Sequence, residues 1–263
     1  MSRNKNTIFG LLVVMILFTC FLLCQGCWWE KPQEKPVLKQ GPALVAPALL
    51  RKSRIDENKL KRQLEIIHPV LPPAKQSRYQ FYITPNDAAV GALAGRINGA
   101  QEAYGEAVQW IWVSDQTLHG ESEKWLMPRE FLSDTPNYPG NPLKGNVVSD
   151  CEEQANTLVS LVRAEGVNPE NVRVVLGKVK FGDEEGGHAW VELWHNGRWL
   201  ALESTSGPYW DDDEGKLVTK GGAPFNYYGN HDYPVIQVWA YYNDIYYLDP
   251  RTSSGNAPDS WQP

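Results

Sequence analysis

Apolar residues run without interruption near the start of the chain. The stretch TIFGLLVVMILFTCFLLC, residues 7–24, contains no charged residue and comes after Arg3 and Lys5. Positive residues ahead of an apolar run stay on the cytoplasmic side of a membrane, so the rest of the chain is predicted to lie outside the cytoplasm. The run's length of about 18 residues is short for a spanning helix and long for a signal-peptide core. Residues 1–27 are therefore predicted to be either a signal peptide or a membrane anchor.

The next segment is too often interrupted by proline for regular structure. Residues 28–55 are rich in proline and lysine, which predicts a tether. A short amphipathic helix is predicted in DENKLKRQLEII, with Leu60, Leu64 and Ile67 on one side, and the prolines of HPVLPP end it. Residues 28–80 are thus predicted to be a tether carrying one short helix, ahead of a domain over residues 81–250 and a tail over 251–263.

Helical periodicity begins after this tether. The stretches NDAAVGALAGRI and AQEAYGEAVQWIWVSDQTL have apolar spacing typical of helices and are separated at Asn98-Gly99. A further helix is predicted to start at Cys151, where Asp150 and Glu153 form an acidic analogue of a capping box, and to end at Gly166.

Strand patterns come after that helix. VRVVLGKV predicts a strand, and GGHAWVELWHNGRWLALEST predicts a hairpin that turns at Asn196-Gly197. A two-residue turn pairs Val191 with Leu202 and leaves His188 diagonally across from Glu203, roughly 7 Å away on the same face. Glu192 shares that face but lies about 13 Å along the strand from His188. Glu203 is therefore the carboxylate predicted to orient His188.

The C-terminal stretch FNYYGNHDYPVIQVWAYYNDIYYLDP predicts two aromatic strands around Asn243-Asp244. They are predicted to complete the sheet. The alternative is that their rings form a stacking platform beside a binding cleft, and the pattern does not separate the two.

Composition and charge exclude some classes of protein. With 42% apolar residues in 263, the chain can bury a core, which excludes disorder throughout. The net charge of −6 gives no basic stripe for a phosphate backbone, so nucleic acid is not a predicted partner.

Cysteine usage points to thiol chemistry. Cys151 is the only cysteine after residue 27, so the exported part has no intramolecular disulfide. One interpretation is an inert, buried thiol. The other is an activated nucleophile, because the first turn of a helix favours thiolate, although Glu152 and Glu153 oppose this and a cationic partner is needed. His188, oriented by Glu203, is the predicted partner.

The end of the apolar run, LLCQGC, resembles the lipobox of secreted lipoproteins. By that resemblance Cys27 would carry a diacylglycerol after cleavage, although Cys24 and Gln25 depart from the commonest pattern. A lipoprotein, an uncleaved anchor and a secreted protein all remain open. The first two predict attachment to the extracytoplasmic face of the cell membrane.

The segments from about Ala107 to Thr205 resemble the transglutaminase-like superfamily, whose core is like that of papain-type cysteine peptidases. The motifs that carry the resemblance are AVQWIWVSDQTL, KWLMPREFL, SDCEEQANTLVSLVRAEGV, VRVVLG, GGHAWVEL and NGRWLALEST. The resemblance implies an α+β fold, with N-terminal helices and the nucleophile helix packed on an antiparallel β-sheet. It also implies Cys151 as nucleophile, His188 as general base and acid, and Glu203 in the place where most relatives have Asp.

The resemblance implies acyl transfer through a Cys151 thioester, on a protein or peptide substrate. A cysteine peptidase or amidase is preferred to a protein crosslinker because the sequence shows no acceptor-amine site. The alternative from another class is a non-catalytic binding or scaffold module. The oxyanion would be held by the Cys151 backbone N–H and by a second donor, for which Gln116, Trp112 and Trp125 are candidates.

The sequence contains only a weak signal for a metal and none for a cofactor. Some members of the superfamily depend on calcium, and Asp211–Glu214 form an acidic run, but the run lacks EF-hand spacing and is typical of a solvated turn. Zinc is disfavoured because His188 and His195 fall on opposite faces of the predicted strand.

Overall fold

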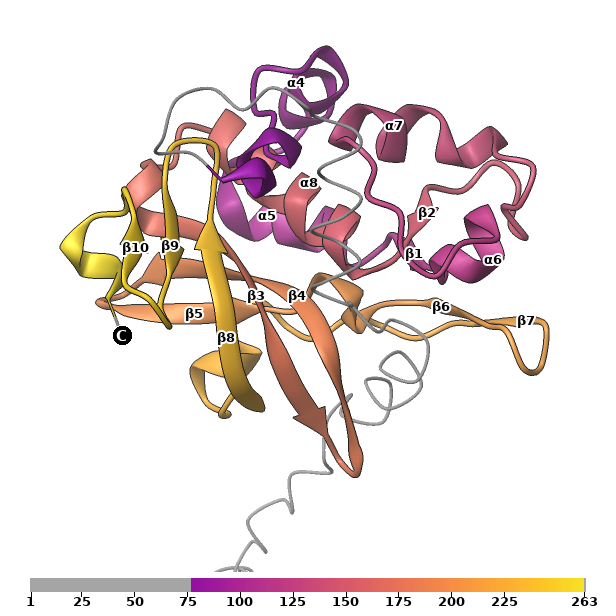
Figure 1. Ribbon diagram of the computed structural model, residues 1–263. Coiled ribbons are helices and arrows are strands. Elements are labelled where there is room, and N and C mark those ends of the chain that lie inside the picture. The colour runs from indigo at the N-terminus through magenta and orange to yellow at the C-terminus, as the bar shows by residue number, and fades with distance from the viewer. Residues whose placement is uncertain (1–76, 263) are drawn as a thin grey trace, which may run out of the picture. The chain divides into compact units, whose positions relative to one another are not determined.

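A computed structural model describes residues 77–262 (Figure 1). The predicted signal peptide or anchor, the candidate lipidation site Cys27 and the tether as far as residue 76 lie outside these residues. Within residues 77–262, none of the helices is long and apolar enough to span a bilayer.

Helices make up most of residues 77–164. Helix α8 begins at Cys151, as predicted. It comes after the 3₁₀ and α-helical segments η2 (Arg78–Tyr82), α4 (Ala88–Ala94), α5 (Gly99–Ala107), α6 (Asp115–His119), α7 (Pro128–Ser133) and η3 (Thr135–Asn137), and itself spans Cys151–Ala164.

The predicted single helix through AQEAYGEAVQWIWVSDQTL is wrong. Helix α5 ends at Ala107, and the buried residues Ile111 and Trp112 form strand β1 before α6 starts. Aromatic and β-branched residues favour a strand, and the Ser114 side chain caps α6 by accepting the backbone N–H of Thr117. Because the apolar residues keep a helical spacing across this break, the pattern predicted one continuous helix.

Two sheets are present in the described residues. The larger has the order β10-β9-β8-β3-β4-β5, with neighbouring strands antiparallel, and the smaller has the order β2-β1-β6-β7. The larger contains β3 (Val172–Phe181), β4 (Glu184–His195), β5 (Arg198–Leu202), β8 (Val235–Tyr242), β9 (Tyr247–Asp249) and β10 (Ser254–Gly255). The smaller contains β1 (Ile111–Trp112), β2 (Val148–Ser149), β6 (Tyr209–Asp211) and β7 (Lys216–Val218).

The β4–β5 hairpin confirms the predicted register. Val191 pairs with Leu202, and the turn residues Asn196 and Gly197 have φ values of 52° and 81°. Both central residues therefore adopt the left-handed conformation that a type I′ turn needs. This register fixes which face of the sheet each hairpin residue occupies.

Both faces of the larger sheet bury apolar side chains. Helix α8 packs on β3 and β4, and Figure 1 shows α4, α5, α7 and α8 together on one side of this sheet. The buried cluster that includes Cys151 and Leu158 of α8 also contains Ala189 and Val191 of β4. A second buried cluster includes Trp190 and Trp261. The fold is thus α+β, with helix α8 packed on an antiparallel sheet.

The C-terminal aromatic strands complete the sheet. Strand β8 pairs with β3, and β9 pairs with β8. The chain after Asp249 forms β10 and a 3₁₀ turn, η7 (Asp259–Trp261), whose Trp261 is fully buried.

The Arg173 guanidinium lies 3.8 Å from the Tyr241 ring centroid and forms an ion pair with Glu192. The Glu192 carboxylate is therefore bound by Arg173 and not by His188.

Candidate functional site

Cys151 begins α8 directly after strand β2, where it is completely buried. Strand β2 pairs in parallel with β1, so that Ser149 lies opposite Trp112. Asp150 is the N-cap residue, but its side chain makes no capping bond, which corrects the predicted capping box. Glu153 instead accepts the Leu126 backbone N–H at 2.8 Å and the Ser149 hydroxyl at 2.7 Å.

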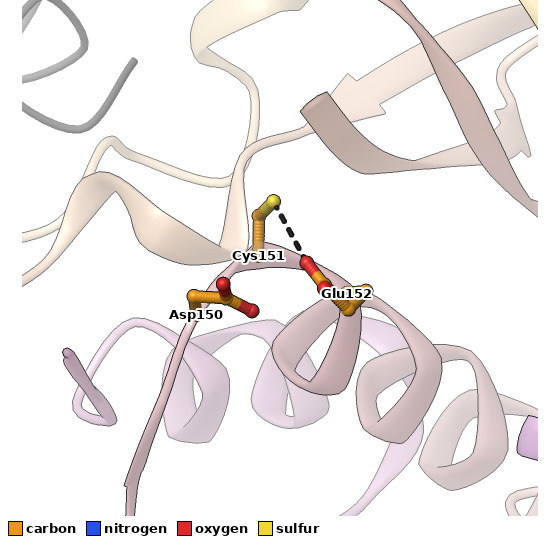
Figure 2. A group of neighbouring side chains, drawn as sticks. All are labelled: Asp150, Cys151 and Glu152. Atoms are coloured by element: carbon orange, nitrogen blue, oxygen red, sulfur yellow. Dashed lines mark hydrogen bonds between the residues drawn. The ribbon is translucent and has the colours of Figure 1, made fainter. Parts of the chain in front are cut away.

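The thiol of Cys151 donates a hydrogen bond to Glu152 Oε2 at 3.2 Å (Figure 2). The backbone N–H of Ala189 lies near its sulfur and lowers the pKa of the thiol. Ala189 is the next residue after His188 in β4, so the sulfur lies within hydrogen-bonding reach of the residue beside the predicted base.

The charge environment of Cys151 differs from the prediction. Burial, and after it the Asp150 carboxylate, raise the pKa of the Cys151 thiol well above its ordinary value. The Ala189 N–H lowers that pKa but does not outweigh burial. A position in the first helical turn therefore does not produce a thiolate by itself, because desolvation disfavours any charged form.

His188 and Glu203 are in direct contact, as the hairpin register predicted. His188 Nε2 lies 2.8 Å from Glu203 Oε2, and both side chains are buried. A carboxylate only accepts hydrogen bonds, so Nε2 carries a proton, and in the neutral imidazole Nδ1 keeps its lone pair. His188 Nδ1 is buried and has no hydrogen-bond partner among residues 77–262. The imidazole is thus held in the form that a general base requires.

Glu203 is saturated with donors. Its Oε1 accepts the backbone N–H of Thr205 at 3.1 Å and the Thr205 hydroxyl at 2.6 Å. Its Oε2 accepts the Tyr233 hydroxyl at 2.5 Å in addition to His188. Burial by itself would raise the pKa of Glu203, but His188 and the hydrogen bonds from Thr205 and Tyr233 hold that pKa below its ordinary value. Glu203 therefore stays ionised although it is buried.

The three oxyanion candidates have different environments. The Trp125 indole N–H donates to Glu123 at 2.7 Å, so this donor is already engaged. Gln116 lies exposed on α6. Trp112 is buried in β1, and its indole N–H has no hydrogen-bond partner among the described residues. Of the three, Trp112 is the one with a buried and free donor.

Several buried carboxyl groups lie close to Cys151. One ligand oxygen from each of Asp115, Asp150 and Glu153 lies within 4.8 Å of the others. Burial raises the pKa of all three carboxyls, and neighbouring carboxylates raise those of Asp115 and Asp150 further. An oxygen of Glu152 also lies within 4.8 Å of an oxygen of Asp150. Carboxylates this close together repel one another, so the cluster needs protons or a cation.

The acidic run Asp211–Glu214, the weak calcium candidate of the sequence, is engaged within the protein. Asp212 accepts hydrogen bonds from the hydroxyls of Ser114 at 2.8 Å and Thr117 at 2.6 Å. Asp211 accepts the backbone N–H groups of residues 213 and 214, which forms a turn. The buried Asp115 cluster therefore offers a better set of cation ligands than this run.

Two residues of the site were missed from the sequence. Tyr233 precedes β8 in the aromatic segment, whose richness in tyrosine was the only signal. Asp115 lies in the segment that was predicted to continue a helix, so its approach to Asp150 had no signal in the spacing.

Comparison with known proteins supports the fold. Residues 121–204 match the family profile of the transglutaminase-like superfamily, and Cys151, His188 and Glu203 all lie in the matched segment. This segment is thus similar to the core domain of the transglutaminase-like superfamily. No curated protein sequence matches the chain.

Solved structures of Legionella pneumophila LapG are also similar to the chain. The calcium-bound structure is 15% identical, with a TM-score of 0.41, and the alignment covers 78% of this chain and 94% of LapG. The EGTA-treated structure is 15% identical, with a TM-score of 0.42, covering 77% of this chain and 93% of LapG.

Proposed function

We propose that this domain is a cysteine peptidase or amidase that hydrolyses amide bonds of protein or peptide substrates. One observation carries the proposal: the buried His188 donates Nε2–H to the ionised Glu203 and keeps Nδ1 free, while the Ala189 N–H contacts the Cys151 sulfur. A thiol, a base and a carboxylate that orients the base are the parts of an activated nucleophile.

In the proposed reaction, His188 Nδ1 takes the proton of the Cys151 thiol. The sulfur attacks the amide carbonyl carbon, and the new C–S bond gives a tetrahedral oxyanion. His188 then returns the proton to the leaving nitrogen as the C–N bond breaks, which leaves a thioester and a free amine. Water, deprotonated by His188, cleaves the thioester and releases the acid and the thiol.

Proton transfer from thiol to imidazole suits this electrostatic environment. Burial raises the pKa of the Cys151 thiol, so the sulfur holds its proton in the resting protein. Glu203 stabilises the imidazolium that forms when His188 takes that proton. The thiol is then neutral at rest, and the thiolate forms only as the sulfur attacks.

The oxyanion would be bound by two N–H donors. The first is the backbone N–H of Cys151, which is in the first turn of α8 and has no partner within the helix. The second is the indole N–H of Trp112, because it is buried and has no partner among the described residues, whereas that of Trp125 is engaged by Glu123.

A non-catalytic scaffold is the second candidate, and the full burial of Cys151 favours it. The saturated Glu203 favours the enzyme, because a carboxylate held in the ionised form by four hydrogen bonds serves no evident structural purpose.

Two sequence features support action outside the cytoplasm: the apolar run 7–24 and the lipobox-like Cys27 would hold the domain at the outer face of the membrane.

Peptide cleavage tests the proposed function. The full-length chain in detergent is expected to cleave members of a mixed synthetic peptide library, with Cys151→Ala inactive because no thioester can form. Mass spectrometry of the library gives both the products and the cleaved bond. Equal product patterns from wild type and Cys151→Ala, at equal folded fractions, would assign the cleavage to a contaminant and favour the scaffold.

The buried acidic cluster also fits a divalent cation. Asp115 Oδ1 and Asp150 Oδ1 are buried without hydrogen-bond partners in the described part of the chain, and the set of ligand atoms is all oxygen, which suits calcium or magnesium. Asp115, Asp150 and Glu153 would hold the ion. Its charge would offset the mutual repulsion of the carboxylates beside the nucleophile.

Calcium is therefore expected to stabilise the folded chain. At a calcium concentration a hundred times the dissociation constant, the gain is about 2.7 kcal/mol, or a rise in Tm of roughly 5 to 10 °C. Thermal unfolding with calcium and with EGTA measures it, and Asp115→Asn is expected to abolish the difference. Asp213→Asn in the exposed acidic turn is the matched control. A response lost in Asp213→Asn and kept in Asp115→Asn would move the site to that turn.

A further inference from the structure

The Tyr233 hydroxyl contacts the proposed triad from a segment far away in sequence. It donates to Glu203 Oε2 at 2.5 Å, the same oxygen that faces His188 Nε2 at 2.8 Å. Tyr233 is in the loop between the 3₁₀ turn η6 (Tyr227–Gly229) and strand β8. One carboxylate oxygen thus receives both the imidazole N–H and a phenol O–H.

The ring of Tyr233 is fixed by its neighbours. It stacks on Trp190, with ring centroids 4.9 Å apart and an interplanar angle of 29°. The Tyr228 ring packs against it edge-on at 4.8 Å, and the Phe181 ring does so at 5.9 Å. Trp190 in turn lies 6.5 Å from the His188 ring and is nearly parallel to it. These rings leave the hydroxyl little freedom, so its hydrogen bond is preorganised.

We infer that Tyr233 is a positioning residue, a fourth member of the site that fixes the rotamer of Glu203 and through it the tautomer of His188. The inference rests on the proposed function. The Tyr233 O–H is a donor without a substrate role, because it is fully engaged by Glu203. Its effect on the reaction therefore passes through the carboxylate.

The hydrogen bonds to Glu203 act against burial. Desolvation favours the neutral acid, and the donors, Tyr233 among them, favour the carboxylate. The titratable groups that face Glu203 are His188 from β4, Tyr104 from α5, Lys220 after β7, and Tyr228 and Tyr233 before β8. Cys151 from α8 acts on Tyr233. Without the Tyr233 hydroxyl, the pKa of Glu203 rises and the acid form appears at higher pH.

The variant Tyr233→Phe removes the hydroxyl and keeps the ring stack. It is expected to lower the rate of Cys151 acetylation by p-nitrophenyl acetate by roughly tenfold to a hundredfold, because a hydrogen bond to a charged group is lost. The acidic limb of the pH–rate profile is expected to move to higher pH. Tyr228→Phe is the matched control, since it removes a neighbouring hydroxyl that does not bond Glu203, and it should leave rate and profile unchanged.

NMR of the imidazole nitrogens tests the same inference without any activity. In the full chain, the His188 signals, assigned with His188→Gln, are expected to show the proton on Nε2 alone. In Tyr233→Phe they should show a mixture of tautomers. A wild-type chain without acetylation would contradict the proposed function, whereas an active wild type with unchanged rate, pH profile and tautomer in Tyr233→Phe would overturn only the role of Tyr233.

Discussion

Replacing His188 with Gln is expected to slow acetyl transfer to Cys151 by about a hundredfold to ten-thousandfold, which is the usual contribution of general acid–base catalysis. The reason is geometric: Nδ1 of His188 is buried and without a hydrogen-bond partner among the described residues, and the neighbouring Ala189 N–H contacts the Cys151 sulfur. With a raised thiol pKa, little thiolate forms unless a base removes the proton. The rate is measured by the release of p-nitrophenol, with Cys151→Ala as background.

His195→Gln is the matched control for this variant. His195 is on the same strand seven residues away, on the opposite face, where its ring packs against Phe225. It should leave the rate unchanged. If both histidine variants retained the full rate with normal unfolding curves, His188 would not be the base that activates Cys151.

The second large effect is expected from Glu203→Gln. In a serine protease triad, the corresponding change from carboxylate to amide lowers turnover by about ten-thousandfold with the geometry intact. We expect a loss of about a thousandfold to ten-thousandfold here, because the amide can donate to His188 Nε2 and so favour the wrong tautomer. Removing the charge also withdraws stabilisation from the imidazolium.

Glu192→Gln tests the competing carboxylate on the same hairpin. Glu192 forms an ion pair with Arg173 at 2.7 Å, so its loss should lower thermal stability and leave acetyl transfer per folded molecule unchanged. The reverse result, with activity lost in Glu192→Gln and kept in Glu203→Gln, would reject the assignment of the third member.

Much of the proposed site could be predicted from local sequence patterns. The Asn196-Gly197 turn has one favoured geometry, so the pairing of Val191 with Leu202 can be derived from the sequence, and the contact of His188 with Glu203 results from that pairing. The start of α8 at Cys151 was also predicted, although the Asp150 capping bond on which that prediction rested is not formed. The hairpin interactions form within a short stretch of chain, where periodicity and turn chemistry determine the geometry.

Contacts between distant segments were not predictable. Tyr233 reaches Glu203 across 30 residues, and Asp115 approaches Asp150 because β1 pairs with β2. Neither approach leaves a periodic signal in the sequence. The pKa of Cys151 was misjudged for the same reason: the helix start was visible in the sequence, but the burial and the carboxyl cluster that outweigh it depend on packing.

A working acyl-transfer pair of Cys151 and His188 should leave a thioester that can be detected on the protein itself. The full chain is mixed with p-nitrophenyl acetate, quenched in acid at successive times and digested with trypsin. The peptide spanning residues 145–163 contains Cys151 and no other cysteine. In wild type, an acetyl thioester on this peptide is expected to form and then decay, and in His188→Gln it should accumulate far more slowly. Cys151 left unmodified in the folded wild-type chain, or acetylated at the same rate in both proteins, would contradict the pairing.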